Sequence, residues 1–246
     1  MDVTPGLLAP ACAAAILAGS TSARAEPASE IARGVPSLGR PHTMAVLEAG
    51  VIALPSAPIS AGQRGGATPF GTIGNGDATL QTGMRLLYRG DPAWAIGAGA
   101  MFGPSPTSDN EYGGLRGLKR THARSYLAID FEGRYIPLRV ADLEAWVGFT
   151  SGVVVVADRY ATDQPTPPSF LGAPSVTVRT EGLSFGAQLG GTWHFAERWG
   201  LGLTTRFARW FLPRVPTCTP IGDCGTLTGS VDAISAGLTI GYRLPL

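Results

Sequence analysis

The feature that most constrains this chain is an alternation of apolar side chains with small or polar ones at every second residue. This is the period of a β-strand, and none of the alternating segments has the period of an amphipathic helix. The sequence therefore predicts an all-β fold built from eight strands. The alternating segments are Met44–Leu54, Ala78–Arg89, Ala93–Phe102, Ala123–Ile136, Asp142–Val155, Gly182–Phe195, Trp199–Phe211 and Ala233–Leu244.

Charged side chains are sorted between the two faces of these strands. The apolar faces carry a single charge, Arg209, near a strand end. A soluble barrel, such as a lipocalin, has an apolar lining and charges outside, whereas a membrane-spanning barrel has the reverse. Because an Arg facing lipid at the midplane costs about 2–4 kcal/mol, we expect the apolar faces to meet lipid. The inward faces then carry Arg89 and a network of Glu48, Arg85, Arg124, Asp130, Glu132, Arg134, Asp142, Glu144, Arg206 and Arg243. We predict that this network fills and stabilises a narrow lumen.

The connections between the segments alternate between short and long. The short ones are residues 90–92, 137–141 and 196–198. The long ones, rich in Pro, Gly, Ser and Thr, are residues 55–77, 103–122, 157–181 and 212–232. Bacterial outer-membrane barrels alternate in this way. The predicted fold is an eight-stranded antiparallel up-and-down transmembrane β-barrel with short periplasmic turns and four long external loops.

Aromatic residues gather near the short turns. They lie on the apolar faces of the strands, close to the turns or to the C-terminus. Amphipathic aromatic rings favour the boundary between membrane and water, so this position predicts a girdle at one membrane interface. The girdle residues are Tyr88, Trp94, Tyr135, Trp193, Phe195, Trp199 and Tyr242.

The first 25 residues have the composition of a secretory signal peptide. Leu7–Gly19 is a short apolar stretch, and Ala23-Arg24-Ala25 is an A-x-A cleavage site, although no Lys or Arg precedes the stretch. A lipoprotein signal ending at Cys12 and an Ala-rich structural helix are the alternatives. The expected division is a signal peptide at 1–25, a periplasmic segment at 26–42 and an outer-membrane barrel at 43–246.

Cysteine usage is consistent with export. Beyond the signal peptide the chain has two cysteines, Cys218 and Cys224, with Pro220 and Gly222 between them. This spacing predicts a disulfide that closes a small loop tip in an oxidising compartment. Such a short closure contributes about 2 kcal/mol. Free thiols are the first alternative, and a metal site would need further ligands, although the three histidines lie far away in sequence.

By these patterns, over about 200 residues, the chain resembles the small eight-stranded outer-membrane barrels of the OmpA/OmpX type. Barrels of that kind end in a C-terminal signal of polar, glycine and apolar or aromatic positions, which Thr239, Gly241, Leu244 and Leu246 match in spacing. Leu246 stands where an aromatic residue is usual, and Pro245 is uncommon there. The resemblance implies an outer-membrane location, contact with lipid, and reading of this signal by the barrel-assembly machinery.

Motifs for chemistry are weak in this sequence. Gly182–Gly186 reads G-x-S-x-G around Ser184, but the strand alternation continues through it, whereas a nucleophile elbow needs a strand, a turn and a helix. His122 and Ser125 near the predicted outer rim leave a lipid A-modifying enzyme as an alternative. We expect no catalytic, cofactor or metal site.

The role expected from the sequence is structural or one of surface interaction. We expect a monomer whose external loops bind an unknown ligand, if any. A net charge of +1 gives no electrostatic basis for nucleic-acid binding. The pattern also leaves open a narrow conduit and a soluble lipocalin-like barrel.

Overall fold

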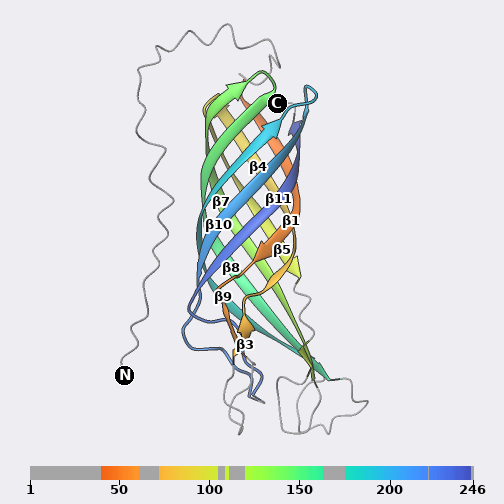
Figure 1. The fold of residues 1–246 in the computed structure, drawn as a ribbon, viewed down its shortest axis with the longest axis vertical. Helices are drawn as coiled ribbons and strands as arrows, with labels where there is room; N and C mark the ends of the chain where they lie inside the picture. Colours follow the sequence, from red (N-terminus) through yellow and green to blue (C-terminus); the bar gives the residue numbers. More distant parts are fainter. Residues whose placement is uncertain are drawn as a thin grey trace, which may run out of the picture.

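Figure 1 shows the computed structural model of the chain, in which residues 40–60, 72–104, 109–110, 120–162, 175–220 and 222–244 are described. Eight long strands form the barrel: β1 (His42–Ala53), β4 (Ala78–Asp91), β5 (Trp94–Pro104), β7 (Arg120–Val140), β8 (Leu143–Thr162), β9 (Ser175–Trp193), β10 (Trp199–Phe211) and β11 (Ser230–Leu244). Three short strands lie in the connections: β2 (Pro58–Ser60), β3 (Thr72–Asn75) and β6 (Asp109–Asn110). The described part of the chain contains no helix long and apolar enough to cross a membrane.

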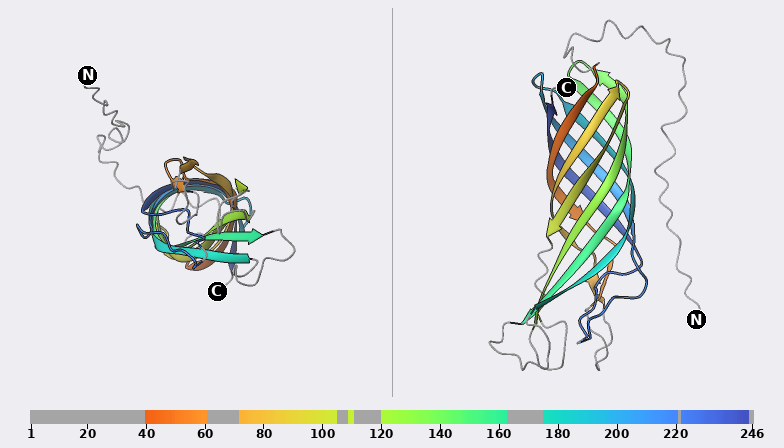
Figure 2. Two further views of the ribbon diagram at one scale, coloured as in Figure 1. Left: turned by 90° about the horizontal axis from the view of Figure 1, so that it is seen from below. Right: turned by 180° about the vertical axis from the view of Figure 1, so that it is seen from behind.

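Each long strand pairs antiparallel with two neighbours, so the sheet closes on itself. The first and last strands, β1 and β11, pair from Thr43↔Leu244 to Ala53↔Ile234. β5 and β7 pair from Trp94↔Tyr135 to Pro104↔Ser125, which completes the ring seen end-on in Figure 2. A closed ring leaves no unpaired edge in the wall. The predicted eight-stranded antiparallel barrel is confirmed.

The two ends of the barrel differ in their connections. At the end that we call the turn end, short links join β4 to β5, β7 to β8 and β9 to β10, and β1 begins and β11 ends there (Figure 1). At the opposite end, the loop end, the connections are long in sequence. Short and long connections alternate as predicted, which places both ends of the barrel segment at the turn end.

Side chains on the strands alternate between the outside of the barrel and its lumen. On β10, Leu203 faces outward and is 64% exposed, whereas Arg206 faces inward and is 5% exposed. The outward apolar residues form a belt that we call the apolar band. On β7, β8 and β9 its last large members toward the loop end are Leu127, Val155 and Leu183. The apolar faces thus point away from the lumen, as the sequence predicted.

Three strands are longer than the sequence predicted, by five residues or more. β7, β8 and β9 have 21, 20 and 19 residues, and they reach beyond the other strands at the loop end (Figure 2). Residues 157–181 were predicted to be a loop. In the described parts of this stretch the two-residue period continues, but the outward side chains are now polar, since Arg159 and Arg179 are exposed while Asp158 and Tyr160 are buried in the lumen. A strand beyond the apolar band meets water, so its outward face carries polar side chains. A prediction based on apolar outer faces therefore ends each strand where its outward side chains become polar.

Candidate functional site: a lumen closed by side chains and a folded loop

Paired charges from facing strands fill the middle of the lumen. Glu48 on β1 accepts hydrogen bonds from Arg85 on β4 and from the side-chain amide of Gln81, the latter at 2.8 Å. The Nε of Arg85 lies 2.9 Å from Glu132 Oε2 on β7, and Arg134 on the same strand also donates to Glu132. These four charged side chains are at most 5% exposed. Removing one partner would leave the other charge buried and unpaired.

The same cluster extends to the opposite wall. The Arg134 guanidinium lies 3.8 Å from the centroid of the Trp146 ring on β8, a cation–π contact. On β10, Arg206 Nη2 lies 3.8 Å from Glu48 Oε2 and donates to Gln188 Oε1 on β9 at 3.3 Å. The middle cluster thus ties together β1, β4, β7, β8, β9 and β10 across the lumen.

A second cluster closes the turn end around Glu144. Arg89 Nη1 lies 3.0 Å from both carboxylate oxygens, and Arg139 Nε donates to Glu144 at 2.8 Å. His194 Nε2 is 3.1 Å from the same carboxylate. Arg243 is buried at this end and is 8% exposed. Arg139 was not among the predicted network residues, because it falls in residues 137–141, which were predicted to be a turn.

Two acids predicted for the network have no ion pair with any described residue. Asp142 lies in the turn between β7 and β8, where its carbonyl accepts a hydrogen bond from the His194 N–H at 2.8 Å. Asp130 points into the lumen and is 7% exposed. The Oδ1 atoms of both residues have no hydrogen-bond partner in the described part of the chain.

An apolar layer crosses the lumen between the middle cluster and the loop end. At its centre the rings of Tyr126 and Trp210 contact each other, with centroids 5.5 Å apart. Leu227 reaches into it from the β10–β11 connection. The layer consists of Ile52, Leu54, Ala57, Met101, Tyr126, Ala128, Val154, Val156, Ala208, Trp210, Leu212, Leu227, Val231 and Ala233. A charged solute would lose its hydration here without compensation. The alternation predicted a polar lumen throughout and gave no sign of this layer.

A third cluster lies beyond the apolar layer, around Asp158 on β8. His122 Nε2 lies 2.7 Å from Asp158 Oδ1, and Arg124 Nε lies 3.3 Å from it. Thr226 donates to the same carboxylate through its backbone N–H at 2.9 Å and its hydroxyl at 2.7 Å. Arg124 also pairs with Asp77 at 3.3 Å. The sequence predicted one continuous network that included Arg124, whereas the apolar layer separates this residue from the middle cluster.

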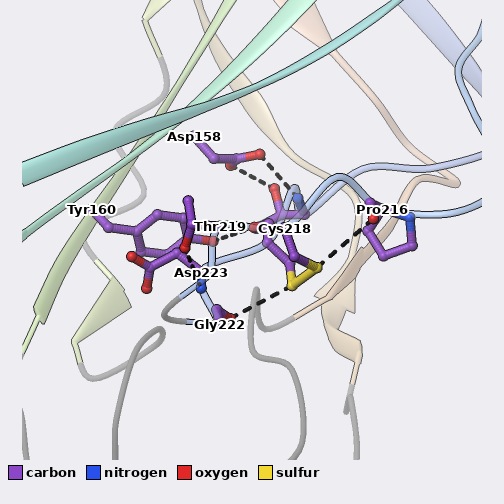
Figure 3. Close-up of a disulfide and its surroundings, with 9 residues drawn as sticks. Asp158, Tyr160, Pro216, Cys218, Thr219, Gly222 and Asp223 are labelled. Atoms are coloured by element: carbon purple, nitrogen blue, oxygen red, sulfur yellow. Dashed lines mark hydrogen bonds between the residues drawn. A yellow bond between two sulfur atoms is a disulfide. The ribbon is translucent and has the colours of Figure 1, made fainter. Parts of the chain in front are cut away.

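The β10–β11 connection folds into the mouth of the barrel above this cluster. We call residues 212–220 and 222–229 the plug. The predicted disulfide between Cys218 and Cys224 is present (Figure 3). It does not lie at an exposed tip, because Cys224 is fully buried. The hydroxyl of Tyr160 donates to the Cys224 carbonyl at 2.6 Å, which fixes the plug to β8.

Asp158 lies outside the membrane-spanning part of β8, since it is beyond Val155, where the apolar band ends. Burial by itself raises the pKa of this carboxyl. The hydrogen bond with His122, the charge of Arg124 and the hydrogen bond with Thr226 outweigh burial, and they hold the pKa of Asp158 below its ordinary value. The cluster therefore favours a charged Asp158, to which the plug is bonded.

The residues weighed for catalysis do not assemble a reactive site. The His122 side chain is fully buried, and its ring stacks on Tyr160 with centroids 4.8 Å apart. Ser125 faces the outside of β7, on the opposite side of the strand. Ser184 is a buried strand residue, 2% exposed, facing the lumen. Among the described residues, no group of three or more His, Cys, Asp or Glu side chains could hold a metal ion.

The aromatic residues of the predicted girdle lie on the outer surface near the turn end. Trp94 contacts Tyr135 and Trp199 contacts Tyr242, each pair with ring centroids 4.8 Å apart, and Trp193 lies 5.8 Å from Phe195. Tyr88 is 47% exposed on β4. Of the residues predicted to form a C-terminal signal, Thr239 and Gly241 face the lumen and Leu244 faces outward. Leu246, Cys12 and the whole of 1–39 fall outside the described residues.

Comparison with known proteins is informative only at the level of the fold. The sequence matches no family profile and no curated protein. Among solved structures, a major outer membrane protein from Thermus thermophilus is similar with a TM-score of 0.52. It is 11% identical, over 82% of this chain and 99% of that one. The chain has the fold of an eight-stranded outer-membrane barrel.

Two other solved outer-membrane barrels align over similar lengths. Neisserial surface protein A is 9% identical over 82% of this chain and 96% of its own, with a TM-score of 0.49. Ail, the attachment invasion locus protein of Yersinia pestis, is 9% identical over 84% of this chain and 99% of its own, with a TM-score of 0.42. At such identities the comparisons concern the fold alone.

Proposed function

We propose that this chain is an outer-membrane protein with a structural or surface-interaction role, which presents its loop end outside the cell and conducts nothing through its lumen. In this proposal residues 1–25 direct export, residues 26–42 lie in the periplasm, and the mature barrel is a monomer. The barrel-assembly machinery reads the C-terminal signal at Thr239, Gly241, Leu244 and Leu246. The turn end faces the periplasm, with the aromatic girdle at that interface.

The observation that carries the proposal is closure of the lumen at successive levels. An ion entering from the turn end meets the Glu144 cluster, then the middle cluster, then the apolar layer. Trp210 and Tyr126 are each 1% exposed, and the plug residue Leu227 is fully buried in the same layer. An eight-stranded barrel has an interior just wide enough for side chains to fill. Because side chains occupy the interior, the loop end is the surface through which this protein interacts with other molecules.

Two measurements test this proposal. The first is planar-bilayer recording of the purified full-length barrel, for which we expect no steady conductance. A steady conductance that Glu132→Lys retunes would overturn the closed-lumen proposal in favour of a narrow conduit. The heat-modifiable band of a folded barrel, found in the outer membrane after fractionation, is the expected localisation. Recovery in the soluble periplasm would contradict it.

The second measurement is of orientation. Arg159 is exposed beyond the apolar band at the loop end, and Glu197 is exposed in a turn at the opposite end. On intact cells, a membrane-impermeant maleimide should label Arg159→Cys and should label Glu197→Cys only after the outer membrane is permeabilised. The matched pair controls for folding and expression. The reverse labelling pattern would show that the loop end faces the periplasm.

A further inference from the structure

A groove runs along the outer wall of the barrel, on the face that the fold turns toward lipid. It has a volume of about 570 Å³ and is lined by Leu86, Tyr88, Ile96, Ala98, Phe131 and Phe149, with Thr43, Gly97, Glu132 and Gly133 also bordering it. These residues come from β1, β4, β5, β7 and β8. The six apolar and aromatic side chains are exposed on the outside of the wall, whereas the side chain of Glu132 is 1% exposed and belongs to the middle cluster on the lumen side of the same wall. Neither the three polar clusters nor the plug accounts for this hollow.

Small residues on β5 and β7 create the groove. Ala98 lies in register between Leu86 on β4 and Phe131 on β7. The two flanking side chains stand out from the wall and are 52% and 74% exposed. In the next row toward the turn end, Ile96 lies in register with Gly133, whose own position is covered by the Phe149 ring. A Cβ at Gly133 would lie 2.4 Å from that ring, so Phe149 is seated there because the residue is glycine.

The turn end of the groove is amphipathic. The Tyr88 ring lies along Gly90 toward the turn, with its hydroxyl oxygen 3.5 Å from where a Cβ of Gly90 would stand. Trp94 and Tyr135, the contacting pair of the girdle, occupy the row just beyond Ile96 and Gly133. Tyrosine and tryptophan at this depth place an apolar body toward the acyl chains and a polar group toward the headgroups.

We propose that this groove binds one acyl chain of a phospholipid from the leaflet nearest the turn end, with the headgroup beside Tyr88. The proposal rests on the outer-membrane location proposed above. Bulk lipid is as apolar as the groove, so the hydrophobic effect does not favour an acyl chain in the groove over one in the bilayer. Binding comes from packing. If the acyl chain passed the groove without entering it, the side chains that line the groove would lose their dispersion contacts with it. Ile96 and Ala98 are about 7 Å apart along the strand. The groove is therefore short compared with an acyl chain and holds only a segment of one.

The test uses the full barrel in vesicles of phosphatidylethanolamine and phosphatidylglycerol that contain a trace of phosphatidylethanolamine with a photoactivatable acyl chain. After illumination, labelled peptides are mapped by mass spectrometry. We expect labelling of peptides that contain residues 86–98 and 131–149 to exceed that of β11 several-fold. Ala98→Phe, which fills the groove, should reduce the labelling to the β11 level. Ala236→Phe on β11, an exposed outward alanine on another part of the wall, should leave the labelling unchanged.

Each outcome is decisive for the groove. Even labelling around the barrel, or labelling that Ala98→Phe does not reduce, would overturn the proposal. A dimer in native mass spectrometry, with cross-links between Ala98→Cys copies, would assign the groove to a second barrel instead of a lipid. Heat modifiability checks that each variant is folded, and Ala98→Leu replaces Ala98→Phe if the larger ring prevents folding. Because the vesicles supply the lipid, failure of outer-membrane localisation in cells is a separate result.

Discussion

We expect the replacement of Glu132 with glutamine to destabilise the barrel more than any other single charge-neutralising substitution in the middle cluster. Its carboxylate pairs with Arg85 through Oε2, at 2.9 Å, and with Arg134 through Oε1. Its side chain is 1% exposed, and those of its partners are 3% and 5% exposed. Glutamine keeps the shape of the side chain and removes its negative charge. Arg85 would then keep its ion pair with Glu48, whereas Arg134 would lose its carboxylate partner.

The magnitude follows from what is left behind. Breaking a buried ion pair costs about 3–5 kcal/mol, mainly because the remaining charge stays buried and uncompensated. Arg134 keeps its contact with the Trp146 ring, worth about 0.5–2 kcal/mol, and a glutamine oxygen can still accept one hydrogen bond. We therefore expect a loss of about 2–4 kcal/mol in the free energy of unfolding.

The assay is equilibrium unfolding in urea of the barrel refolded into lipid vesicles, followed by tryptophan fluorescence and by the heat-modifiable band. Glu181→Gln is the control, because Glu181 is exposed on the outside of β9 and should change stability by less than about 0.5 kcal/mol. The double variant Glu132→Gln with Arg134→Met removes the stranded charge and should recover part of the loss. If Glu132→Gln costs less than about 1 kcal/mol, or if the double variant is additive, the reasoning from buried pairing is wrong.

Four further predictions concern other parts of the structure. Leu238→Arg, at an outward position that is 58% exposed, should block assembly at a cost of about 2–4 kcal/mol, which the heat-modifiable band reports. Thr226→Val removes the hydroxyl that donates to Asp158, so amide hydrogen exchange in the plug should become faster while that of β10 is unchanged. The fold lowers the pKa of Asp158, so this carboxylate should stabilise the plug fully above about pH 4 and lose that effect as the pH falls further. Asp158→Asn should abolish this pH dependence, measured by hydrogen exchange corrected for intrinsic rates. Cys218→Ser should cost no more than about 2 kcal/mol in urea unfolding, and thiol labelling of the unreduced wild type would contradict the disulfide altogether.

The sequence by itself determined the strands, their number and which face of each meets lipid. These properties depend on one strand at a time. Along β10, for example, the alternation from Leu203 to Arg206 states both the period and the environment of each face, because lipid rejects the charge and the lumen accepts it. The same local logic fixed the order of short and long connections and the pairing of two nearby cysteines.

Prediction from the local pattern failed where one strand passes from the apolar band into water. On β8 the outward face is apolar up to Val155 and polar from Arg159, while Val156 and Tyr160 turn inward. The period is intact, but the outward face changes from apolar to polar. Only the three-dimensional structure shows how far the strands continue once they have left the apolar band.

The partners of the buried charges were decided by the tertiary structure alone. Asp158 meets Thr226, 68 residues further along the chain, and Arg124 meets the same threonine across 102 residues. Which charges face each other depends on register, and a slip of one residue would turn every side chain of a strand to the opposite face. The division of one expected network into three clusters, the apolar layer and the plug that seals it all follow from that register. Apart from Glu132 and Arg134, which share one strand, these contacts join residues of different strands or connections, so no single strand contains this information.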